Sequence, residues 1–361
     1  MNKNRLLRSI LKSIGIVALA LLLLVAGYVA SVFITYKRIP DNQAMEINQI
    51  STQKAVTGEI YGIVTYNLGF GAYLPDFSFF MDGGENSVAK SKESVVYAVS
   101  GAADAVAKLD PDFIAFQEVD LDGTRSYHVN QLQILKDSFG EYSNTHAVNF
   151  DSAFLAYPIL EPHGKNKACI ATFSRFEIED AFRRSLPIST SVTKVLDLDR
   201  CYSISRIPVE GGKALCLFNI HMSAYSSDPN VRSGQIQMFV ADMQKEYEAG
   251  NYVICAGDFN HDLKNMEEDQ VPQFSWAYPF PRTQLPEGFS FAMDVLPKEE
   301  VQGLWDSARN ADIPYIPGET LTITLDGFIL SDNIQVVSYT NVDLGYAYSD
   351  HDPVYMEFIL K

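Results

Sequence analysis

Residues 348–358 read YSDHDPVYMEF and place a histidine, His351, between two aspartates directly before a strand-like run. Ser, Asp and Pro all favour turns, and a proline at the start of a strand removes no hydrogen bond from the ladder. Taken alone, these residues are therefore explained by a turn that opens a strand at Pro353. A different explanation is needed only if partners for Asp350 and His351 occur elsewhere in the chain.

Patterns typical of β-strands and α-helices alternate from residue 59 to the C-terminus. The predicted strands cover residues 59–66, 112–117, 168–174, 200–207, 213–221, 252–256, 322–330 and 354–360, and the predicted helices cover 94–108 and 231–248. Residues 59–117 form a β-α-β unit, and Gly211-Gly212 turns two later strands into a hairpin. We therefore predict an α/β fold of two packed mixed β-sheets flanked by helices, a four-layer α-β-β-α sandwich.

Polar residues stand at the ends of at least five predicted strands, where the side chains of neighbouring strands meet. They are Asn67, Gln117 and Glu118, Asn219 and His221, Asp258 and Asn260, and Asp350 and His351. Each has an ordinary structural explanation, such as a turn for Asp258, a helix cap for Glu118 and a satisfied buried histidine for His221. Their joint occurrence favours a functional site instead.

The order of the blocks YN, QE, NIH, GDFN, LDGF and SDH resembles the endonuclease/exonuclease/phosphatase superfamily, which includes pancreatic deoxyribonuclease, apurinic endonucleases, inositol polyphosphate phosphatases and neutral sphingomyelinases. GDFN at 257–260 and SDH at 349–351 are the most specific blocks, and TFSRF at 172–176 also fits. The resemblance runs from about residue 59 to the C-terminus and is weakest over 262–320. It implies the four-layer fold and hydrolysis of a phosphate ester.

The resemblance also implies a metal site built from hard oxygen ligands. Hydrolysis of a phosphate ester needs a hard cation on the phosphoryl oxygens, a water placed for in-line attack, and neutralisation of charge on the leaving oxygen. Glu118 is the principal ligand expected, supported by Asn67 and Asp350. Mg²⁺ is the expected cofactor, with Mn²⁺ as a substitute.

Five residues receive catalytic roles from the same resemblance. Asp258 would orient or deprotonate the attacking water, and Asn260 would hold that water or a phosphate oxygen. His351 would contact the phosphate, with Asp326 fixing its tautomer. His221 would lie near the phosphate or the leaving group.

The remaining candidates are assigned structural roles or left open. Arg125, shortly after the QEVD block, is either a phosphate contact or a surface arginine, and Asp352 is expected to be a turn residue only. Four histidines lack metal-ligand spacing and four cysteines lie in apolar runs without CxxC spacing, so neither a zinc site nor a disulfide framework is predicted. These residues are His128, His146, His163, His261, Cys169, Cys201, Cys216 and Cys255.

The N-terminal segment is predicted to be a membrane anchor. Residues 14–34 contain no charge, and as a helix this run would span roughly 30 Å, the thickness of a bilayer's hydrocarbon core. Basic residues concentrate before the run, so the positive-inside rule places the N-terminus in the cytoplasm. The protein would then cross the cell membrane once, with the residues after the run outside the cell. A cleaved signal peptide is the alternative. The expected organisation is residues 1–13 as a cytoplasmic basic N-terminus, 14–34 as the anchor, 35–57 as a linker and 58–361 as the catalytic domain.

The net charge of the predicted catalytic domain helps to rank the possible substrates. Residues 1–38 hold six of the 28 Lys and Arg and no acid, so residues 39–361 carry 22 basic against 45 acidic side chains, a formal charge of 22 − 45 = −23. A protein that grips long nucleic acid normally offers a basic stripe, and none is visible in the sequence. Long nucleic acid is therefore a less favoured partner, and no protein partner is inferable.

Residues 70–84, FGAYLPDFSFFMDGG, form an aromatic stretch directly after the strand that ends at Asn67. It either folds back onto the core or rims the site as an apolar wall for a lipid-linked or aromatic leaving group. We therefore expect a membrane-tethered, metal-dependent phosphoesterase that acts on a small or lipid-type phosphoester. The alternatives are an extracellular nuclease, because bases also stack on aromatic side chains, and a non-catalytic binding module on the same fold.

Overall fold

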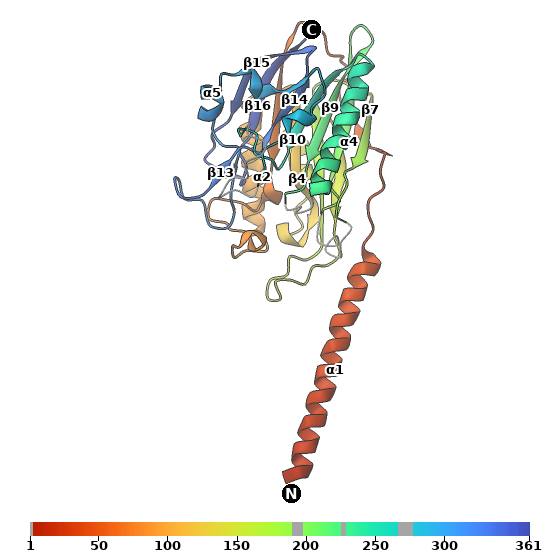
Figure 1. The fold of residues 1–361 in the computed structure, drawn as a ribbon, viewed down its shortest axis with the longest axis vertical. Helices are drawn as coiled ribbons and strands as arrows, with labels where there is room; N and C mark the ends of the chain where they lie inside the picture. The colour runs from red at the N-terminus through yellow and green to blue at the C-terminus, as the bar shows by residue number, and fades with distance from the viewer. Residues whose placement is uncertain (1–2, 190–197, 225–228, 266–276) are drawn as a thin grey trace.

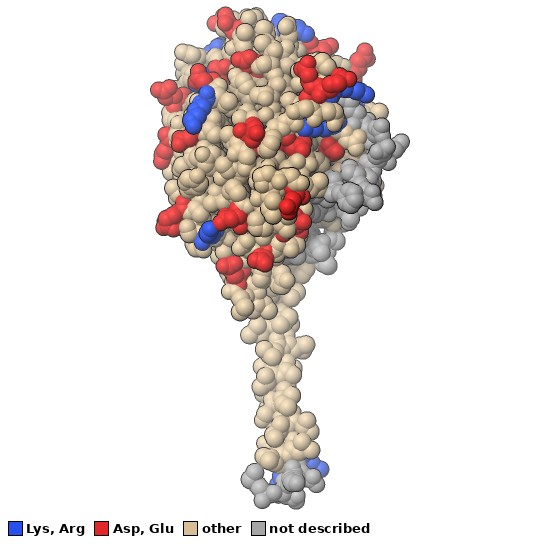
Figure 2. Space-filling view, turned by 90° about the vertical axis from the view of Figure 1, so that its left-hand side faces the viewer, with Lys and Arg blue, Asp and Glu red and all other residues tan. Residues whose placement is uncertain are grey.

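Helix α1 (Lys3–Thr35) extends away from the rest of the chain in the computed structural model, which describes residues 3–189, 198–224, 229–265 and 277–361 (Figure 1). On the face shown in Figure 2 its shaft carries no charged side chain, and basic side chains appear only near its N-terminal end. The helix is long and apolar enough to cross a membrane, and a signal sequence has the same properties.

After α1, the described residues form two seven-stranded mixed β-sheets. The first has the strand order β1 (Gln43–Ala44), β7 (Asp180–Ser185), β8 (Cys201–Val209), β9 (Lys213–His221), β10 (Tyr252–Asp258), β14 (Asp326–Ser331) and β11 (Phe289–Phe291). The second has the order β15 (Ile334–Asn341), β16 (Val354–Leu360), β3 (Ile60–Asn67), β4 (Phe113–Gly123), β6 (Asn166–Ser174), β5 (Ser143–Asp151) and β2 (Ile47–Asn48). A separate two-stranded ribbon pairs β12 (Ala308–Arg309) with β13 (Thr322–Ile323).

Helices cover the outer faces of the two sheets. Helices α2 (Lys92–Ala107) and α3 (Gln131–Ser138) pack on the second sheet, α4 (Pro229–Glu248) packs on the first, and α5 (Lys298–Gly303) is a single short helix (Figure 1). Short 3-10 turns lie in the connections at Gly69–Gly71, Phe80–Asp82, Thr124–Ser126, Arg282–Gln284 and Ala292–Val295. The predicted four-layer sandwich is therefore confirmed.

The central strands are apolar on both faces because each sheet lies between the other sheet and a helical layer. In β3, Ile63 faces the core between the two sheets, whereas its neighbour Val64 faces the core beneath α2. In β4, Phe113 likewise faces the core between the sheets, and Ile114 faces the core beneath α2. Successive side chains of a strand point to opposite faces, so a strand buried on both faces reads as a continuous apolar run.

The predicted strand over 322–330 is wrong, because two elements with different partners occupy it. Strand β13 belongs to the small ribbon, and β14 begins only at Asp326. The side-chain oxygen of Ser307 accepts hydrogen bonds from the backbone N–H groups of Leu325 and Asp326, which fixes the chain where the two strands separate. Asp326 is thereby the first residue of a strand rather than an interior one.

Part of the predicted linker is built into both sheets. Strand β1 pairs with β7 at the edge of the first sheet, and β2 pairs with β5 at the edge of the second. Ala55 forms a further bridge to Val209. Residues 43–55 therefore hold the chain against the domain soon after α1 ends.

Strand direction gathers several strand ends at one end of the sandwich. Strands β3 and β4 run parallel, as do β9 and β10, so their C-terminal ends coincide in pairs. Strand β14 is antiparallel to β10 and β16 is antiparallel to β3, so both begin where their partners finish. Polar residues that follow the first four strands therefore meet residues that precede or start the last two.

Candidate active site

The gathered strand ends surround a cavity whose walls come from both sheets. His221 ends β9, Asp258 ends β10 and Asp326 starts β14 in the first sheet. Asn67 ends β3, Glu118 lies in β4 and His351 precedes β16 in the second. Seven of the predicted site residues line this active-site cavity, namely Glu118, Arg125, His221, Asp258, Asn260, Asp350 and His351.

Glu118 reaches the cavity because the strand that carries it is irregular at that point. The register of β4 against β6 shifts between Phe116 and Val119, and Glu118 has a positive φ of 52°. A β-bulge of this kind re-aims one side chain at the cost of local strain. Burial raises the pKa of Glu118 and the nearby charge of Asp350 adds to the rise, whereas Arg125 opposes it.

Asp258 lies between the two sheets and is almost completely buried. Its Oδ1 accepts from the backbone N–H of Asn260 at 2.8 Å, and its Oδ2 accepts from Nδ2 of Asn67 at 3.0 Å. Burial raises the pKa of Asp258, as does the negative charge of Asp326, while His351 lowers it. The carboxyl group is therefore far more basic than an exposed aspartate, as a general base requires.

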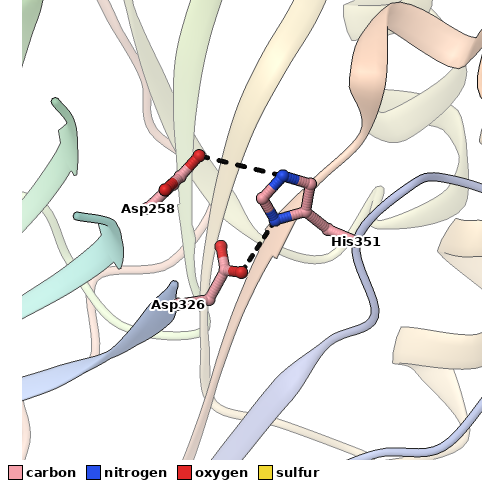
Figure 3. A group of neighbouring side chains, drawn as sticks. All are labelled: Asp258, Asp326 and His351. Atoms are coloured by element: carbon pink, nitrogen blue, oxygen red, sulfur yellow. Dashed lines mark hydrogen bonds and ion pairs between the residues drawn. The ribbon is translucent and has the colours of Figure 1, made fainter. Parts of the chain in front are cut away.

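His351 bridges two aspartates (Figure 3). Its Nδ1 lies 2.7 Å from Oδ2 of Asp326, and its Nε2 lies 3.9 Å from Oδ2 of Asp258. A carboxylate only accepts, so Nδ1 carries a proton and donates to Asp326, and Nε2 can donate as well when the ring is protonated. Burial lowers the pKa of His351, but the charges of Asp326, Asp350 and Asp258 outweigh it and raise the pKa well above its ordinary value.

Asn67 positions carboxylates from behind the cavity. Its Oδ1 accepts from the backbone N–H of Gly69 at 3.0 Å, which fixes the amide orientation because that group only donates. Its Nδ2 then donates to Asp258 and, at 3.3 Å, to Oε1 of Glu118. The side chain of Asn67 thereby orients Glu118 and Asp258 relative to each other, and its role as a metal ligand stays a prediction.

His221 is a neutral, buried imidazole beside the carboxyl groups of Asp258 and Glu118. Its Nε2 lies 3.6 Å from Oδ2 of Asp258 and 3.8 Å from Oε1 of Glu118. Burial, reinforced by the positive charge of Arg200, lowers the pKa of His221 well below its ordinary value. Its Nδ1 has no hydrogen-bond partner among the described residues.

The comparisons with known proteins agree with this geometry. Residues 64–310 match the sequence profile of the Endonuclease/Exonuclease/phosphatase family. The chain belongs to this family. The matched range includes Asn67, Glu118 and Asp258 but ends before Asp326 and His351, which the fold brings to the same cavity. No curated protein matches the chain by sequence.

Solved structures share the fold at low sequence identity. A family protein from Bacteroides vulgatus is 16% identical, with a TM-score of 0.53 over 84% of this chain and 100% of that one. ANGEL2, a 2′,3′-cyclic phosphatase, is 13% identical, with a TM-score of 0.54 over 90% and 99%. TDP2 from D. rerio, complexed with a single-strand DNA product, is 17% identical, with a TM-score of 0.53 over 83% and 99%.

The donor set fits a hard divalent cation, which members of the family require. Glu118 and Asp350 both line the cavity, and their mutual repulsion contributes to the raised pKa of Glu118. Carboxylates that face one cavity are the ligand type that Mg²⁺ and Mn²⁺ prefer. A cation between them would relieve this repulsion.

A second group of ligand-type atoms belongs to Asp258, Asp326 and His351, whose atoms lie within 4.8 Å of one another. Oδ2 of Asp326 already accepts from His351 and from the hydroxyl of Ser307 at 2.7 Å. Two of the atoms in this cluster are therefore already joined by a hydrogen bond, between Asp326 and His351.

Three arginines line the cavity, and only Arg125 was among the sequence candidates. Arg125 forms a two-pronged ion pair with Asp120 at 2.8 and 3.1 Å and stacks on the ring of Phe70. It is therefore a buried residue rather than a surface arginine. Sequence reasoning missed Arg200, which directly precedes β8 at the same end of the sheet as His221, and Arg309, for which the sequence gives no signal.

Arg309 holds the aromatic stretch 70–84 against the site. Its guanidinium donates to the carbonyl oxygens of Tyr73, Leu74 and Phe77 at 3.2–3.4 Å. The two expectations for this stretch both hold in part. Phe70, Tyr73 and Phe79 are buried in the core beneath α2, and together with Met81 they also line the active-site cavity.

One residue that was assigned a structural role needs a correction. Asp352 is more than a turn residue, because its buried Oδ2 accepts from Nε1 of Trp305 and from the backbone N–H groups of Leu344 and Tyr346. His163 also lines the cavity, with Nδ1 bonded to the carbonyl oxygen of Ser87 at 2.7 Å. All four cysteines are buried and free of disulfides.

Proposed function

We propose that the chain is a membrane-tethered, metal-dependent phosphoesterase that hydrolyses a phosphodiester or phosphomonoester through in-line attack by water. The observation that carries this proposal is the pairing of two carboxylates, Glu118 and Asp350, with the basic carboxyl group of Asp258 and the Nε2 of His351 around one cavity. Cation ligands, a base for water and a hydrogen-bond donor for the phosphate are together on its walls.

Each residue has a defined task in this mechanism. Mg²⁺, or Mn²⁺ in its place, would be held by Glu118 and Asp350 and would neutralise charge on the phosphoryl oxygens. Asp258 orients the attacking water and accepts its proton, since its raised pKa makes it a competent base. His351 donates from Nε2 to a phosphoryl oxygen while Asp326 holds the ring in position.

The other side chains complete the electrostatic environment. His221 stays neutral, so it can donate to the phosphate or to the leaving oxygen without adding a charge. Asn260 donates from Nδ2 to the carbonyl oxygen of Met222 at 2.8 Å, which fixes its side chain at the cavity wall near the attacking water. Arg125, locked by Asp120, provides fixed positive charge for the phosphate.

The tether places the catalytic domain outside the cytoplasm in this proposal. The basic residues of α1 precede its uncharged stretch, and chains with this charge asymmetry leave the N-terminus inside. The acidic domain and the partly apolar wall formed by Phe70, Tyr73 and Phe79 favour a small or lipid-type phosphoester over long nucleic acid.

Hydrolysis by the full chain in nanodiscs tests the function. With Mg²⁺ it should release p-nitrophenol from bis(p-nitrophenyl) phosphate, and EDTA should stop the reaction. Asp258→Asn should lower kcat by about a hundredfold or more, the usual scale for loss of a general base. Asp112→Asn is the matched control, because Asp112 lies just before the start of β4, at the end of the strand away from Glu118. Metal-independent turnover, or full activity of Asp258→Asn, would refute the proposal.

Parallel assays on single-stranded DNA, RNA, sphingomyelin, phospholipids and inositol phosphates would rank the substrates. Cleavage of DNA alone would favour an extracellular nuclease, and one similar structure, TDP2 from D. rerio, was solved with a single-strand DNA product. Tight binding of a phosphoester without turnover would favour a non-catalytic module.

A further inference from the structure

We propose that residues 153–162, here called the 153–162 loop, form a second membrane contact that inserts into the bilayer beside α1 and holds the mouth of the active-site cavity at the lipid surface. This inference rests on the proposed membrane tether and deepens the proposed function, because it makes membrane lipid the source of the phosphoester. The bilayer is the single occupant that it assigns to the loop.

The loop is an apolar protrusion. Four of its side chains are exposed, with relative exposures of 50% for Phe154, 69% for Tyr157, 83% for Ile159 and 99% for Leu160. Its one charged residue, Glu161, turns its backbone carbonyl toward the domain, where it accepts from the hydroxyl of Ser87. An exposed cluster of large apolar side chains marks an interaction site rather than a solvated loop.

The loop contacts the anchor helix within its apolar stretch. The hydroxyl of Tyr28 donates to the carbonyl oxygen of Phe154 at 3.0 Å and accepts from the backbone N–H of Ala156 at 2.9 Å. Tyr28 lies seven residues before Thr35, the last residue of α1, which is about 10 Å along the axis at ~1.5 Å per residue. A bilayer that encloses the uncharged run to Ile34 therefore also encloses the level at which the loop meets the helix.

The connection between α1 and the domain is too short to let the loop move away. Arg38 donates to the carbonyl oxygen of Leu186 at 2.5 Å, and the backbone N–H of Ile39 donates to Asp199 at 3.2 Å. The domain is thus engaged within four residues of the helix end. Figure 1 shows α1 leaving the sandwich at the end opposite the C-terminus.

The same loop forms part of the active-site cavity. Leu155 lines the cavity together with Met81 of the aromatic stretch. The ring of Tyr157 packs against that of Phe80 at 5.9 Å between centroids. A loop that inserts into lipid would therefore bring the cavity wall to headgroup depth, where the phosphate of a membrane lipid lies. The domain's acidity gives it no electrostatic attraction to an anionic bilayer, so apolar insertion has to supply the contact.

Insertion is measurable without any enzyme activity. The four native cysteines are buried, so a single Leu160→Cys can be labelled selectively with an NBD fluorophore in the full chain. In dioleoylphosphatidylcholine vesicles we expect a blue-shifted emission that nitroxide-labelled acyl chains quench. Ile60→Cys is the matched control, because Ile60 is 57% exposed but pairs with Ile359 near the C-terminus, and its label should remain in water.

Quenching that equals the Ile60→Cys control would overturn the insertion. A blue shift that ignores nitroxide lipids but grows with protein density would also overturn it, since a second copy of the chain would then cover the loop.

The effect on substrate access separates this inference from the proposed function. The assay uses whichever vesicle lipid the parent protein hydrolyses. Relative to the parent, the double variant Ile159→Glu with Leu160→Glu should hydrolyse that lipid at least tenfold more slowly and should hydrolyse bis(p-nitrophenyl) phosphate at a rate within twofold. Equal rates on vesicle lipid in both proteins would overturn the inference and leave the phosphoesterase intact. Quenched NBD without turnover of any phosphoester would reject the phosphoesterase and retain the insertion. Hydrolysis of bis(p-nitrophenyl) phosphate but of no vesicle lipid would overturn the lipid source.

Discussion

Asp326 and His351 belong to opposite sheets, yet Oδ2 of Asp326 and Nδ1 of His351 are joined by a 2.7 Å hydrogen bond. Asp326 opens β14 in the first sheet, and His351 precedes β16 in the second. The relative position of the sheets therefore determines where Nε2 of His351 points. The bond acts as a positioning device for the proposed phosphate donor.

Loss of that bond should affect turnover more than binding. Asp326→Asn keeps the shape but removes the charge that holds the imidazole, so we expect kcat to fall by about a hundredfold with KM changed little. Asp352→Asn, a buried carboxylate that does not line the cavity, should lower thermal stability more than kcat. Steady-state kinetics and thermal melts on the same preparations decide the matter, and a kcat of Asp326→Asn within twofold of the parent contradicts the role.

Metal binding should stabilise the fold through Glu118 and Asp350. Mg²⁺ at about a hundredfold above its Kd adds roughly 2.7 kcal/mol to the unfolding free energy, which calorimetry or a thermal melt detects as a rise in Tm. Glu118→Gln and Asp350→Asn should remove most of that rise, because each deletes a carboxylate that faces the cavity. An undiminished Mg²⁺-dependent shift in both variants would place the cation elsewhere.

The backbone at Glu118 should be strained in the metal-free protein. Its φ of 52° costs an L-residue about 1–2 kcal/mol, a cost that glycine avoids. Glu118→Gly should therefore be more stable than Glu118→Ala by about 1 kcal/mol in urea unfolding, the reverse of the usual order at a strand position. If the alanine variant is the more stable one, the bulge is not strained.

The stability of the domain should fall below neutral pH through His163. Burial, with the charge of Arg125, lowers the pKa of His163 from 6.5 to about 4. The unfolded chain then binds the proton first, so stability is full above pH 6.5 and is lost as pH falls toward 4, by up to about 3 kcal/mol. His163→Asn preserves a donor to Ser87 and should flatten this part of the profile. Parallel stability curves for the two proteins over this window would contradict the assignment.

The anchor should remain attached and should leave the domain outside. A protease added to intact cells should remove the domain from the membrane fraction, and N-terminal sequencing of the mature protein should begin near Met1. A soluble form that begins after about residue 30 would show a cleaved signal sequence instead.

The sequence predicts the parts of this molecule that depend on local patterns. Strands β9 and β16 were predicted with their observed bounds, because β9 is a continuous buried run after Lys213 and β16 begins directly after Pro353 with an alternating pattern. The strand-end rule correctly brought Asp258 and His351 to one cavity, since strand direction alone sets where such residues lie.

Features that depend on distant contacts were not predictable. Edge strand β15 alternates exposed and buried residues irregularly, and the break before Asp326 depends on Ser307 from another segment. Arg309 gives no local signal, because its role follows from carbonyl groups more than 230 residues away in the chain. Arg200 could have been predicted from the sequence, because it stands at the start of a strand predicted to pair antiparallel with the strand that ends at His221, and the start of such a strand lies beside the end of its partner.

The short strands β1 and β2 have a consequence for aggregation. An uncovered edge strand exposes a row of unpaired N–H and C=O groups that recruits other chains. Strand β1 covers the edge of β7 and β2 covers that of β5, so one short segment caps both sheets on the same side. Shedding of the domain by cleavage after residue 48 would uncover both edges and favour self-association, whereas release at residue 38 would leave them capped.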